Sequence, residues 1–292
     1  MRLHILEGGG EGGGEGGGEG GGGGGGAAGG EYVGAPVPQG APFLLFDPLG
    51  GAVTKKDLNF HAHFPLSAWQ PDLFGVIALA EFGATNWQNR ITPPSPPTDH
   101  KHIFHEIEQL FAMARDERPA LISEILDQNA RLRGYFAQVL MLAAWSHSET
   151  LKAIEMAMRV GQMVAVYYKI HFRRARPQQV CPALVPLINS PWHASFPSAH
   201  SLESHLIARA LAEIRPHSKR ELIALADRIG RNREVAGVHY PSDTAAGRTI
   251  AEQAFELMKT CDSFKKIVER SLHEPGAADH QPHDTEPDAL KE

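Results

Sequence analysis

The 292-residue chain has few cysteines and no long hydrophobic run. Cys181 and Cys261 are its only cysteines and lie 80 positions apart, so the sequence predicts neither a disulfide framework nor a cysteine zinc site. The longest apolar runs, such as VLMLAAW at 139–145, are far shorter than the roughly 20 residues that a membrane-spanning helix requires. We therefore expect a soluble protein with ordinary thiols in a reducing compartment.

Positive charge and export signals are also scarce. The chain has 28 Lys and Arg against 34 Asp and Glu, a net charge of −6, which argues against general nucleic-acid binding. The start, MRLHILEGGG, lacks the apolar stretch of a secretory signal. We expect no nucleic-acid partner, no integral membrane association and a cytoplasmic location, with export left open.

Glycine and proline are unevenly distributed and suggest the domain boundaries. Residues 7–30 hold 18 of the 30 glycines, so we expect 1–30 to form a disordered tail rich in Gly and Glu. Residues 31–101 contain clustered prolines and glycines and are expected to form a loop-rich extension packed on the core. A helical domain follows over 102–272, and 273–292 are expected to form a disordered C-terminal tail.

From residue 102 onward, apolar residues recur at helical spacing. No segment alternates apolar and polar residues for long enough to predict a sheet. The expected fold class is therefore all-α, a compact helical bundle. The predicted helices cover 102–117, 119–145, 149–174, 198–214, 218–236 and 243–271.

One segment, YYKIHFRRARPQQV at 167–180, concentrates positive charge. The apolar stripe of the helix before it, continued at 100° per residue, brings Lys169 to the core-facing side, with Arg173 one turn later. Arg176 lies two turns beyond Lys169, whereas Arg174 points away and is expected at the surface. Unpaired buried cations are costly, so Lys169 and Arg176 require an anion nearby. Cations that only complement a helix dipole are the alternative.

A second motif, SFPSAHS at 195–201, precedes a helical pattern. Pro197 and Ser198 are typical of a helix start, whose free backbone N–H groups favour an anion. His200 falls in the first turn of this helix. The alternative is an ordinary helix start without a function.

A third motif, RNREVAGVHYPSD at 231–243, again directs a cation inward. The spacing from Leu222 and Ile229 places Arg233 on the buried stripe. His239 follows, and Asp243 lies near the start of the last helix, where it could also be an N-terminal cap.

Together the three motifs resemble the superfamily that joins type 2 phosphatidic acid phosphatases, bacterial soluble acid phosphatases and vanadium-dependent haloperoxidases. The family pattern is Lys-x6-Arg-Pro, then Pro-Ser-Gly-His, then Ser-Arg-x5-His-x3-Asp. This sequence has KIHFRRARP at 169–177, PSAH at 197–200 and NREVAGVHYPSD at 232–243. The resemblance implies a helical bundle of the acid phosphatase/vanadium haloperoxidase type, with 102–272 as its catalytic domain.

The resemblance also implies an anion site. Lys169, Arg176 and Arg233 would hold the equatorial oxygens of a phosphate or vanadate, aided by Ser198 and the backbone N–H of Ala199. Ala199 stands where the family has glycine, and Asn232 stands where it has serine before the arginine. Neither departure removes a charged group.

The remaining motif residues would carry the reaction. The resemblance implies that His239 is the nucleophile that forms a phosphohistidine, that Asp243 orients it, and that His200 protonates the leaving-group oxygen. Phosphoryl transfer depends mainly on positioning and on neutralising oxygen charge, so three cations and a helix start require no metal or other cofactor.

We therefore expect a phosphatase acting on a small-molecule phosphomonoester. The alternative is a vanadium-dependent haloperoxidase, in which vanadate is the cofactor and His239 its ligand. Only 19 residues separate Pro177 from Pro197, which favours the compact phosphatase type, although the nearby Trp192, His193 and Phe196 could line a peroxidase pocket. A non-catalytic anion-binding protein is a third hypothesis, and the sequence leaves open whether the chain forms a homo-oligomer.

Histidines elsewhere suggest a metal site only weakly. HAH at 61–63 and HKHIFHE at 100–106 contain ligand types, and His102 and Glu106 share a helix face. No third ligand is identifiable, so no metal site is predicted there.

Overall fold

The computed structural model describes residues 55–64 and 69–276. Within these ranges the chain is helical and contains no strand, which confirms the all-α class. The predicted tail 1–30 and residues 277–292 lie outside the described residues, and the predicted domain boundaries stay predictions. None of the helices in the described ranges has the length and apolar character needed to cross a bilayer.

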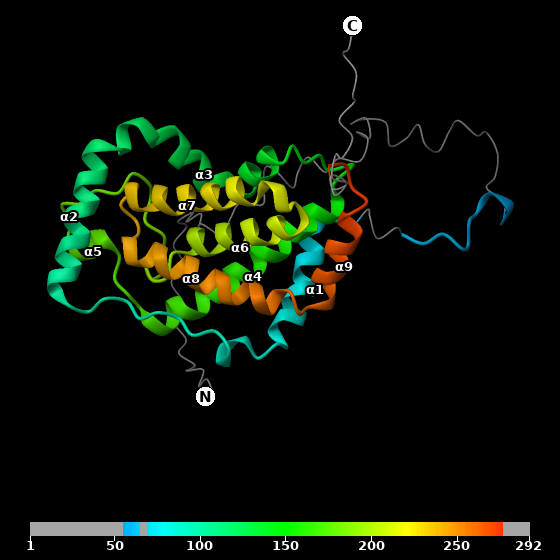
Figure 1. The fold of residues 1–292 in the computed structure, drawn as a ribbon, viewed down its shortest axis with the longest axis horizontal. Coiled ribbons are helices and arrows are strands. Elements are labelled where there is room, and N and C mark those ends of the chain that lie inside the picture. Colours follow the sequence, from blue (N-terminus) through cyan, green and yellow to red (C-terminus); the bar gives the residue numbers. More distant parts are fainter. Residues whose placement is uncertain (1–54, 65–68, 277–292) are drawn as a thin grey trace, which may run out of the picture.

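The longer helices and the short 3-10 helices are joined by loops, among them residues 181–198 between α5 and α6 (Figure 1). In chain order they are η1 (Lys55–Asp57), α1 (Pro71–Gly83), η3 (Trp87–Asn89), α2 (His100–Asp116), α3 (Arg118–Val139), α4 (Ser148–Phe172), α5 (Pro177–Val180), α6 (Ala199–Ile214), η4 (Pro216–Ser218), α7 (Lys219–Val235), α8 (Pro241–Met258) and α9 (Asp262–Ser271).

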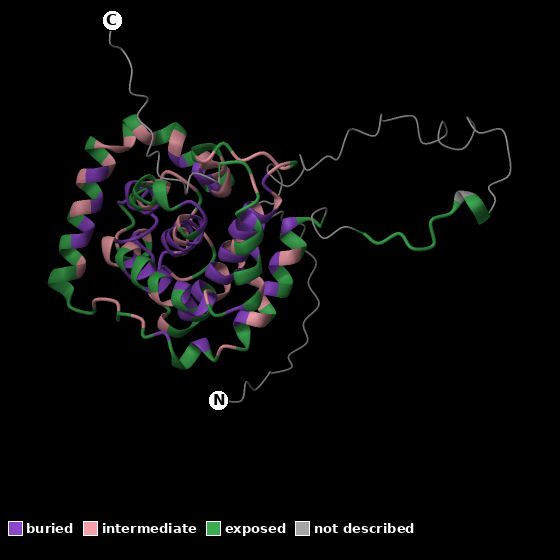
Figure 2. Ribbon diagram, turned by 45° about the vertical axis from the view of Figure 1, so that its right-hand side comes forward, coloured by how far each residue is buried: buried purple, intermediate pink, exposed green. Residues whose placement is uncertain are grey.

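Helix α6 is the centre of the bundle. It packs against α4, α7 and α8, and most of its residues are buried, as Figure 2 shows for the interior of the bundle. A helix that is apolar on most sides is stable only when other helices surround it. The central position of α6 fixes its N-terminus between the ends of α4, α7 and α8.

Helix α1 lies where the sequence analysis expected loops. It packs on α4 and buries Ala78 and Phe82, but it also exposes Leu73, Val76 and Ile77. Because apolar residues occur on every side of α1, the periodicity that identifies an amphipathic helix is missing. Much of 31–101 lies outside the described residues, but this part of it is helical.

The segment predicted as one helix over 243–271 is two helices. Helix α8 ends at Met258, and α9 begins at Asp262. The carboxylate of Glu81, from α1, accepts hydrogen bonds from the backbone N–H groups of Asp262 and Ser263. These bonds satisfy the free donors at the start of α9. A cap from a distant helix leaves no signal in the local sequence.

Candidate active site

The structure brings the predicted site residues together where several helices end. Lys169 lies in the last turn of α4, Arg233 in the last turn of α7, and the second motif starts α6. The third motif ends in the first turn of α8. The residues gathered there are Lys169, Arg176, Ser198, Ala199, His200, Arg233, His239 and Asp243.

His239 is buried and oriented by Asp243. Its Nδ1 lies 3.1 Å from Oδ2 of Asp243, so the ring donates Nδ1–H and keeps a lone pair on Nε2. That nitrogen lies 3.5 Å from Nη1 of Arg176. Burial and then the charge of Arg176 hold the pKa of His239 well below its usual range. The ring is therefore a neutral imidazole whose nucleophilic nitrogen, Nε2, faces Arg176.

Asp243 is ionised and tightly held. Its Oδ2 accepts from His239, from the hydroxyl of Ser195 and from the backbone N–H of Tyr240. Burial alone would raise the pKa of Asp243, but the hydrogen bond from His239, followed by the charge of Arg174, holds it at about 2. The carboxylate therefore stabilises a positive charge on His239 throughout the neutral and mildly acidic range.

Two of the predicted cations, Lys169 and Arg176, contact the last part of the loop before α6. The Lys169 ammonium donates to the carbonyl oxygens of Ala194 and Ser195, at 2.8 and 3.0 Å. Arg176 donates to the carbonyl oxygens of His193 and Val238, at 2.9 and 2.7 Å. These contacts are to neutral groups, so they fix both cations in position without neutralising their charge.

Arg233 is nearly fully buried, with 1% of its surface exposed. Its Nη2 donates to the carbonyl oxygen of Ile125 and its Nη1 to Asn129. Within the described residues its Nε has no hydrogen-bond partner. Burial lowers the pKa of Arg233 only to about 10, so the side chain stays charged. A buried, charged donor without a partner is what an anion site requires.

None of the three cations makes a salt bridge with a carboxylate of the described ranges. Burial lowers the pKa of Lys169 to about 7 and that of Arg176 to about 10. Both shifts show that positive charge is destabilised at these positions. A bound anion with two negative charges would remove most of this destabilisation.

His200, in the first turn of α6, lies close enough to the cationic cluster for those charges to lower its pKa. Burial and then the surrounding positive groups hold its pKa well below the usual range. Those groups are Arg233, Lys169 and Arg176. Its ring nitrogens make no hydrogen bond to the described part of the chain. His200 is therefore positioned beside the cluster with a ring that is free to bind a ligand.

Helix α6 starts within the second motif, as the sequence predicted. Ser198 is its N-cap, and its backbone N–H donates to the carbonyl oxygen of Asp243, at 3.0 Å. Ala199 is half-buried, and its methyl group packs against the hydrophobic core. The Asn232 side chain points away from the site and donates to Glu124 and Gln128 of α3. The position that departs from the family serine therefore stabilises helix packing.

Two sequence predictions about arginines were wrong. Arg173 is exposed, because α4 ends at that residue in a left-handed conformation, with φ of 49°. Arg174, expected at the surface, has a side chain that is only 8% exposed. The turn after α4 redirects it toward Asp243 and Glu106. Both errors come from extending the helix past its true end.

Sequence reasoning also missed two residues at the site. Ser195, within the second motif, donates to Asp243. Nothing in the sequence around this serine indicated that contact. Glu106 was considered only as a metal ligand, whereas its carboxylate pairs with Arg174 at 2.7 Å. No three His, Cys, Asp or Glu side chains in the described ranges are grouped to hold a metal.

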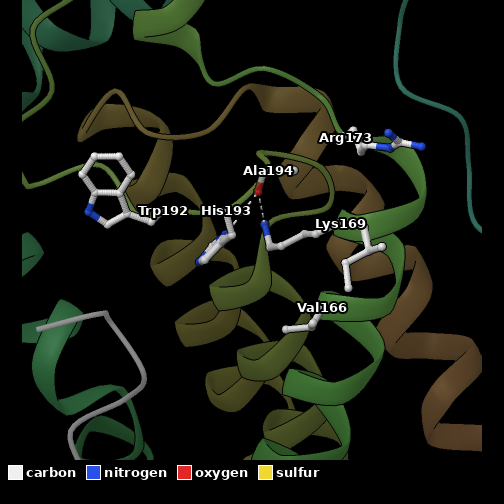
Figure 3. Close-up of a pocket in the computed structure, with 7 residues that line it drawn as sticks. Val166, Lys169, Arg173, Trp192, His193 and Ala194 are labelled. Carbon is white, nitrogen blue, oxygen red and sulfur yellow. Dashed lines mark hydrogen bonds between the residues drawn. The ribbon is translucent and has the colours of Figure 1, made fainter. Parts of the chain in front are cut away.

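A pocket of about 470 Å³ opens beside Lys169 (Figure 3). The ring of His193 lines it and accepts from Nη2 of Arg176, at 3.0 Å. Trp192 also lines the pocket and is 98% exposed. Phe196 is buried and packs edge-on against Phe172, so of the three candidate pocket residues it is the one used for loop packing.

Part of the sequence is similar to known phosphatases. Residues 151–264 match the PAP2 superfamily. The non-specific acid phosphatase of Salmonella typhimurium is 32% identical over 82 residues, 28% of this chain and 33% of that protein. The decaprenylphosphoryl-5-phosphoribose phosphatase of Mycobacterium tuberculosis is 36% identical over 88 residues, 30% of this chain and 48% of that protein.

A similar solved structure is a transmembrane PAP2 type phosphatidylglycerolphosphate phosphatase from Bacillus subtilis. It has a TM-score of 0.43 and 18% identity, and the similarity covers 65% of this chain and 94% of that one. The chain spans a third to a half of the length of the curated relatives named above. The matched segment contains all three motifs, from Lys169 to Asp243. The part of the chain that matches the PAP2 superfamily is therefore the part that carries the candidate site.

Proposed function

We propose that the protein hydrolyses phosphomonoesters through a phosphohistidine intermediate on His239. One observation carries the proposal. Three buried cations, which form no salt bridge with a carboxylate in the described ranges, lie close to His200 and His239. The free Nε2 of His239 faces one of them, Arg176. The cations are Lys169, Arg176 and Arg233. A phosphate dianion supplies the charge that this cluster lacks.

The reaction follows from the roles that the geometry supports. Nε2 of His239 attacks phosphorus, the P–N bond forms and the ester P–O bond breaks. His200, in its protonated form, gives a proton to the leaving oxygen. Water then attacks the phosphohistidine, gives a proton back to His200, and the P–N bond breaks to release inorganic phosphate. Asp243 stabilises the positive charge that His239 carries in between.

His200 must gain a proton before it can act as an acid. In the free protein the cationic cluster keeps its pKa well below the usual range. A bound phosphate dianion offsets the charges of Lys169, Arg176 and Arg233, which removes much of this effect. Substrate binding and protonation of His200 are therefore coupled, and this favours activity at mildly acidic pH.

The relatives support the reaction class. The acid phosphatase and the decaprenylphosphoryl-5-phosphoribose phosphatase are similar to this chain over 82 and 88 residues. Both are phosphatases by name, on different substrates. We propose the shared reaction for this chain, with a small-molecule phosphate ester as its substrate.

The test is a paired assay on one metal-free preparation. Hydrolysis of an aryl phosphate is measured from pH 4 to 8, and oxidation of halide by peroxide with and without vanadate. We expect hydrolysis that vanadate inhibits, no halide oxidation, and loss of hydrolysis in His239→Ala. His105→Ala, an exposed position on α2, is the matched control and should keep full activity.

Two results would contradict the proposal. Equal background rates for the wild type and His239→Ala would show that the chain binds anions without turnover. Vanadate-dependent halide oxidation would instead make His239 a vanadium ligand and the protein a haloperoxidase.

A further inference from the structure

The second carboxylate oxygen of Asp243 is bound by Arg174, a residue to which the family pattern assigns no role. Oδ2 accepts hydrogen bonds from His239, Ser195 and Tyr240. The other oxygen, Oδ1, accepts from Nη1 of Arg174, at 2.6 Å. The guanidinium of Arg174 also lies over the ring of Tyr240, 3.8 Å from its centroid. Stacking on an aromatic face fixes the plane of the guanidinium. Both oxygens of Asp243 are therefore held, so the carboxylate cannot rotate away from His239.

Arg174 is itself fixed by a buried carboxylate. Its Nη2 donates to Oε2 of Glu106, at 2.7 Å, and Glu106 is only 2% exposed. The other oxygen of Glu106 accepts from the backbone N–H of Ser242, at 2.8 Å. Ser242 lies in the first turn of α8, next to Asp243. Glu106 therefore aligns both the arginine and the helix turn that carries Asp243.

We propose that Arg174 and Glu106 are positioning residues of the His239–Asp243 pair, so that α2 completes the active site. Glu106 lies on α2, which precedes the matched segment 151–264. The chain of contacts runs from Glu106 to Arg174, to Asp243 and to His239. The effect on turnover rests on the proposed function, whereas the effect on the histidine ring does not.

The competing explanation is that these contacts only stabilise the fold. Buried ion pairs seldom stabilise a fold more than apolar side chains of the same size would. Moreover, α2 has another link to α7, because Arg231 donates to Glu117, at the end of α2, at 2.6 Å. That exposed pair does not touch Asp243. Removing that pair is therefore a matched control, because it loosens the attachment of α2 without changing the contacts of Asp243.

The first experiment compares kinetics in four variants. Glu106→Gln, Arg174→Gln and Arg174→Lys alter the chain of contacts, and Glu117→Gln is the control. We expect kcat for an aryl phosphate to fall about 10- to 100-fold in Glu106→Gln and Arg174→Gln, because a small misplacement of a reacting group costs about that much. KM and inhibition by vanadate should change less than about threefold, since the phosphate-binding cations are untouched. Arg174→Lys keeps the charge and should restore part of kcat.

The second experiment measures the histidine ring directly. Nitrogen-15 NMR of the wild type should show His239 with its proton on Nδ1, and His239→Ala assigns the signal. In Arg174→Gln and Glu106→Gln, we expect a mixture of tautomers, because Asp243 is no longer fixed. Glu117→Gln should match the wild type. This measurement needs no substrate, so it tests the inference even if the wild type does not hydrolyse phosphate esters.

The inference is overturned by either of two results. One is an unchanged His239 tautomer in folded Glu106→Gln and Arg174→Gln. The other is a loss of kcat matched by Glu117→Gln, which would assign the contacts to the attachment of α2 alone. If Arg174→Gln does not fold, Glu106→Gln decides, since its amide oxygen can still accept from Ser242 while the charge and the acceptor for Arg174 are lost.

Discussion

Gly247 of α8 lies directly against the carbonyl oxygen of Ser198 at the start of α6. A Cβ atom at position 247 would lie 2.7 Å from that oxygen and 3.0 Å from the backbone nitrogen of Leu202. Backbone therefore packs on backbone where the two helices that carry His200 and Asp243 meet. The relative position of these two side chains depends on the absence of a side chain at residue 247.

Gly247→Ala should separate the two helices and reduce both stability and turnover. Neither neighbouring group is the flexible end of a side chain, so backbone must move. We expect a loss of about 1–3 kcal/mol in the free energy of unfolding, the usual cost of overpacking, and a lower kcat. Urea unfolding and aryl phosphate hydrolysis measure the two effects.

Gly134→Ala is the matched control for this variant. Gly134 lies within α3, and a Cβ there would meet only the Cβ of Arg131, at 3.9 Å. Because alanine favours a helix by about 1 kcal/mol over glycine, this variant should be as stable as the wild type or more so. Equal stability of Gly247→Ala and Gly134→Ala would contradict the close packing described above.

Asp243→Asn should remove most of the activity without unfolding the protein. An amide can no longer stabilise a positive charge on His239, and it can turn its NH2 group toward Nδ1, which selects the wrong tautomer. We expect kcat to fall by about 10⁴, as for an orienting aspartate replaced by asparagine in a serine protease. Steady-state kinetics measures this fall. Asp262→Asn, in an exposed pair with Lys265, should have no effect on kcat, and a fall below tenfold in Asp243→Asn would argue against its role.

Helical spacing was enough to predict that Lys169 and Arg233 point inward. Lys169 and Arg233 follow apolar stripes of their helices, and a charged residue on such a stripe must point inward. The structure places both among the buried residues. Helix geometry is local, so a sequence pattern can report it.

The contacts that hold Asp243 could not be predicted in the same way. Arg174 lies after the left-handed residue that ends α4, and helical spacing no longer applies there. Its partner Glu106 is 68 positions away, and nothing in the sequence indicates that this side chain of α2 reaches Arg174 and the start of α8. The same limit applies to α9, whose cap comes from Glu81. Long-range polar contacts depend on the tertiary structure, which the local sequence does not report.

Ser195→Ala should lower turnover by a smaller factor than Asp243→Asn. The hydroxyl of Ser195 donates to Oδ2 of Asp243 and lies 3.5 Å from Nδ1 of His239. Its loss leaves the carboxylate with its other donors, so we expect kcat to fall about tenfold or less, with KM unchanged. Steady-state kinetics measures both constants. Ser195→Thr, which keeps the hydroxyl, should retain more activity than Ser195→Ala, and the reverse order would point to a packing effect.

Anion binding should weaken as pH rises, because Lys169 loses its charge. Burial and then the charge of Arg176 lower its pKa from the ordinary 10.5 to about 7. Sulfate is the appropriate probe, since it remains a dianion throughout this range. We expect its Kd, measured by calorimetry, to increase severalfold between pH 6 and pH 9. Lys169→Met should bind sulfate weakly with little pH dependence, and Lys265→Met, an exposed position on α9, should behave like the wild type.

The same shift predicts the opposite trend for stability without sulfate. Between about pH 7 and pH 10.5 the unfolded chain binds a proton at Lys169 that the folded protein has released, so stability rises with pH through this window. Below pH 7 both states hold the proton, and the folded state carries the full cost of a buried cation. Urea unfolding without sulfate should therefore show stability rising with pH in this window, and saturating sulfate, which keeps Lys169 protonated in the folded protein, should flatten that rise. The difference between the two conditions should vanish in Lys169→Met. A rise that is equally steep with and without sulfate would mean that Lys169 is not the group whose charge holds the anion.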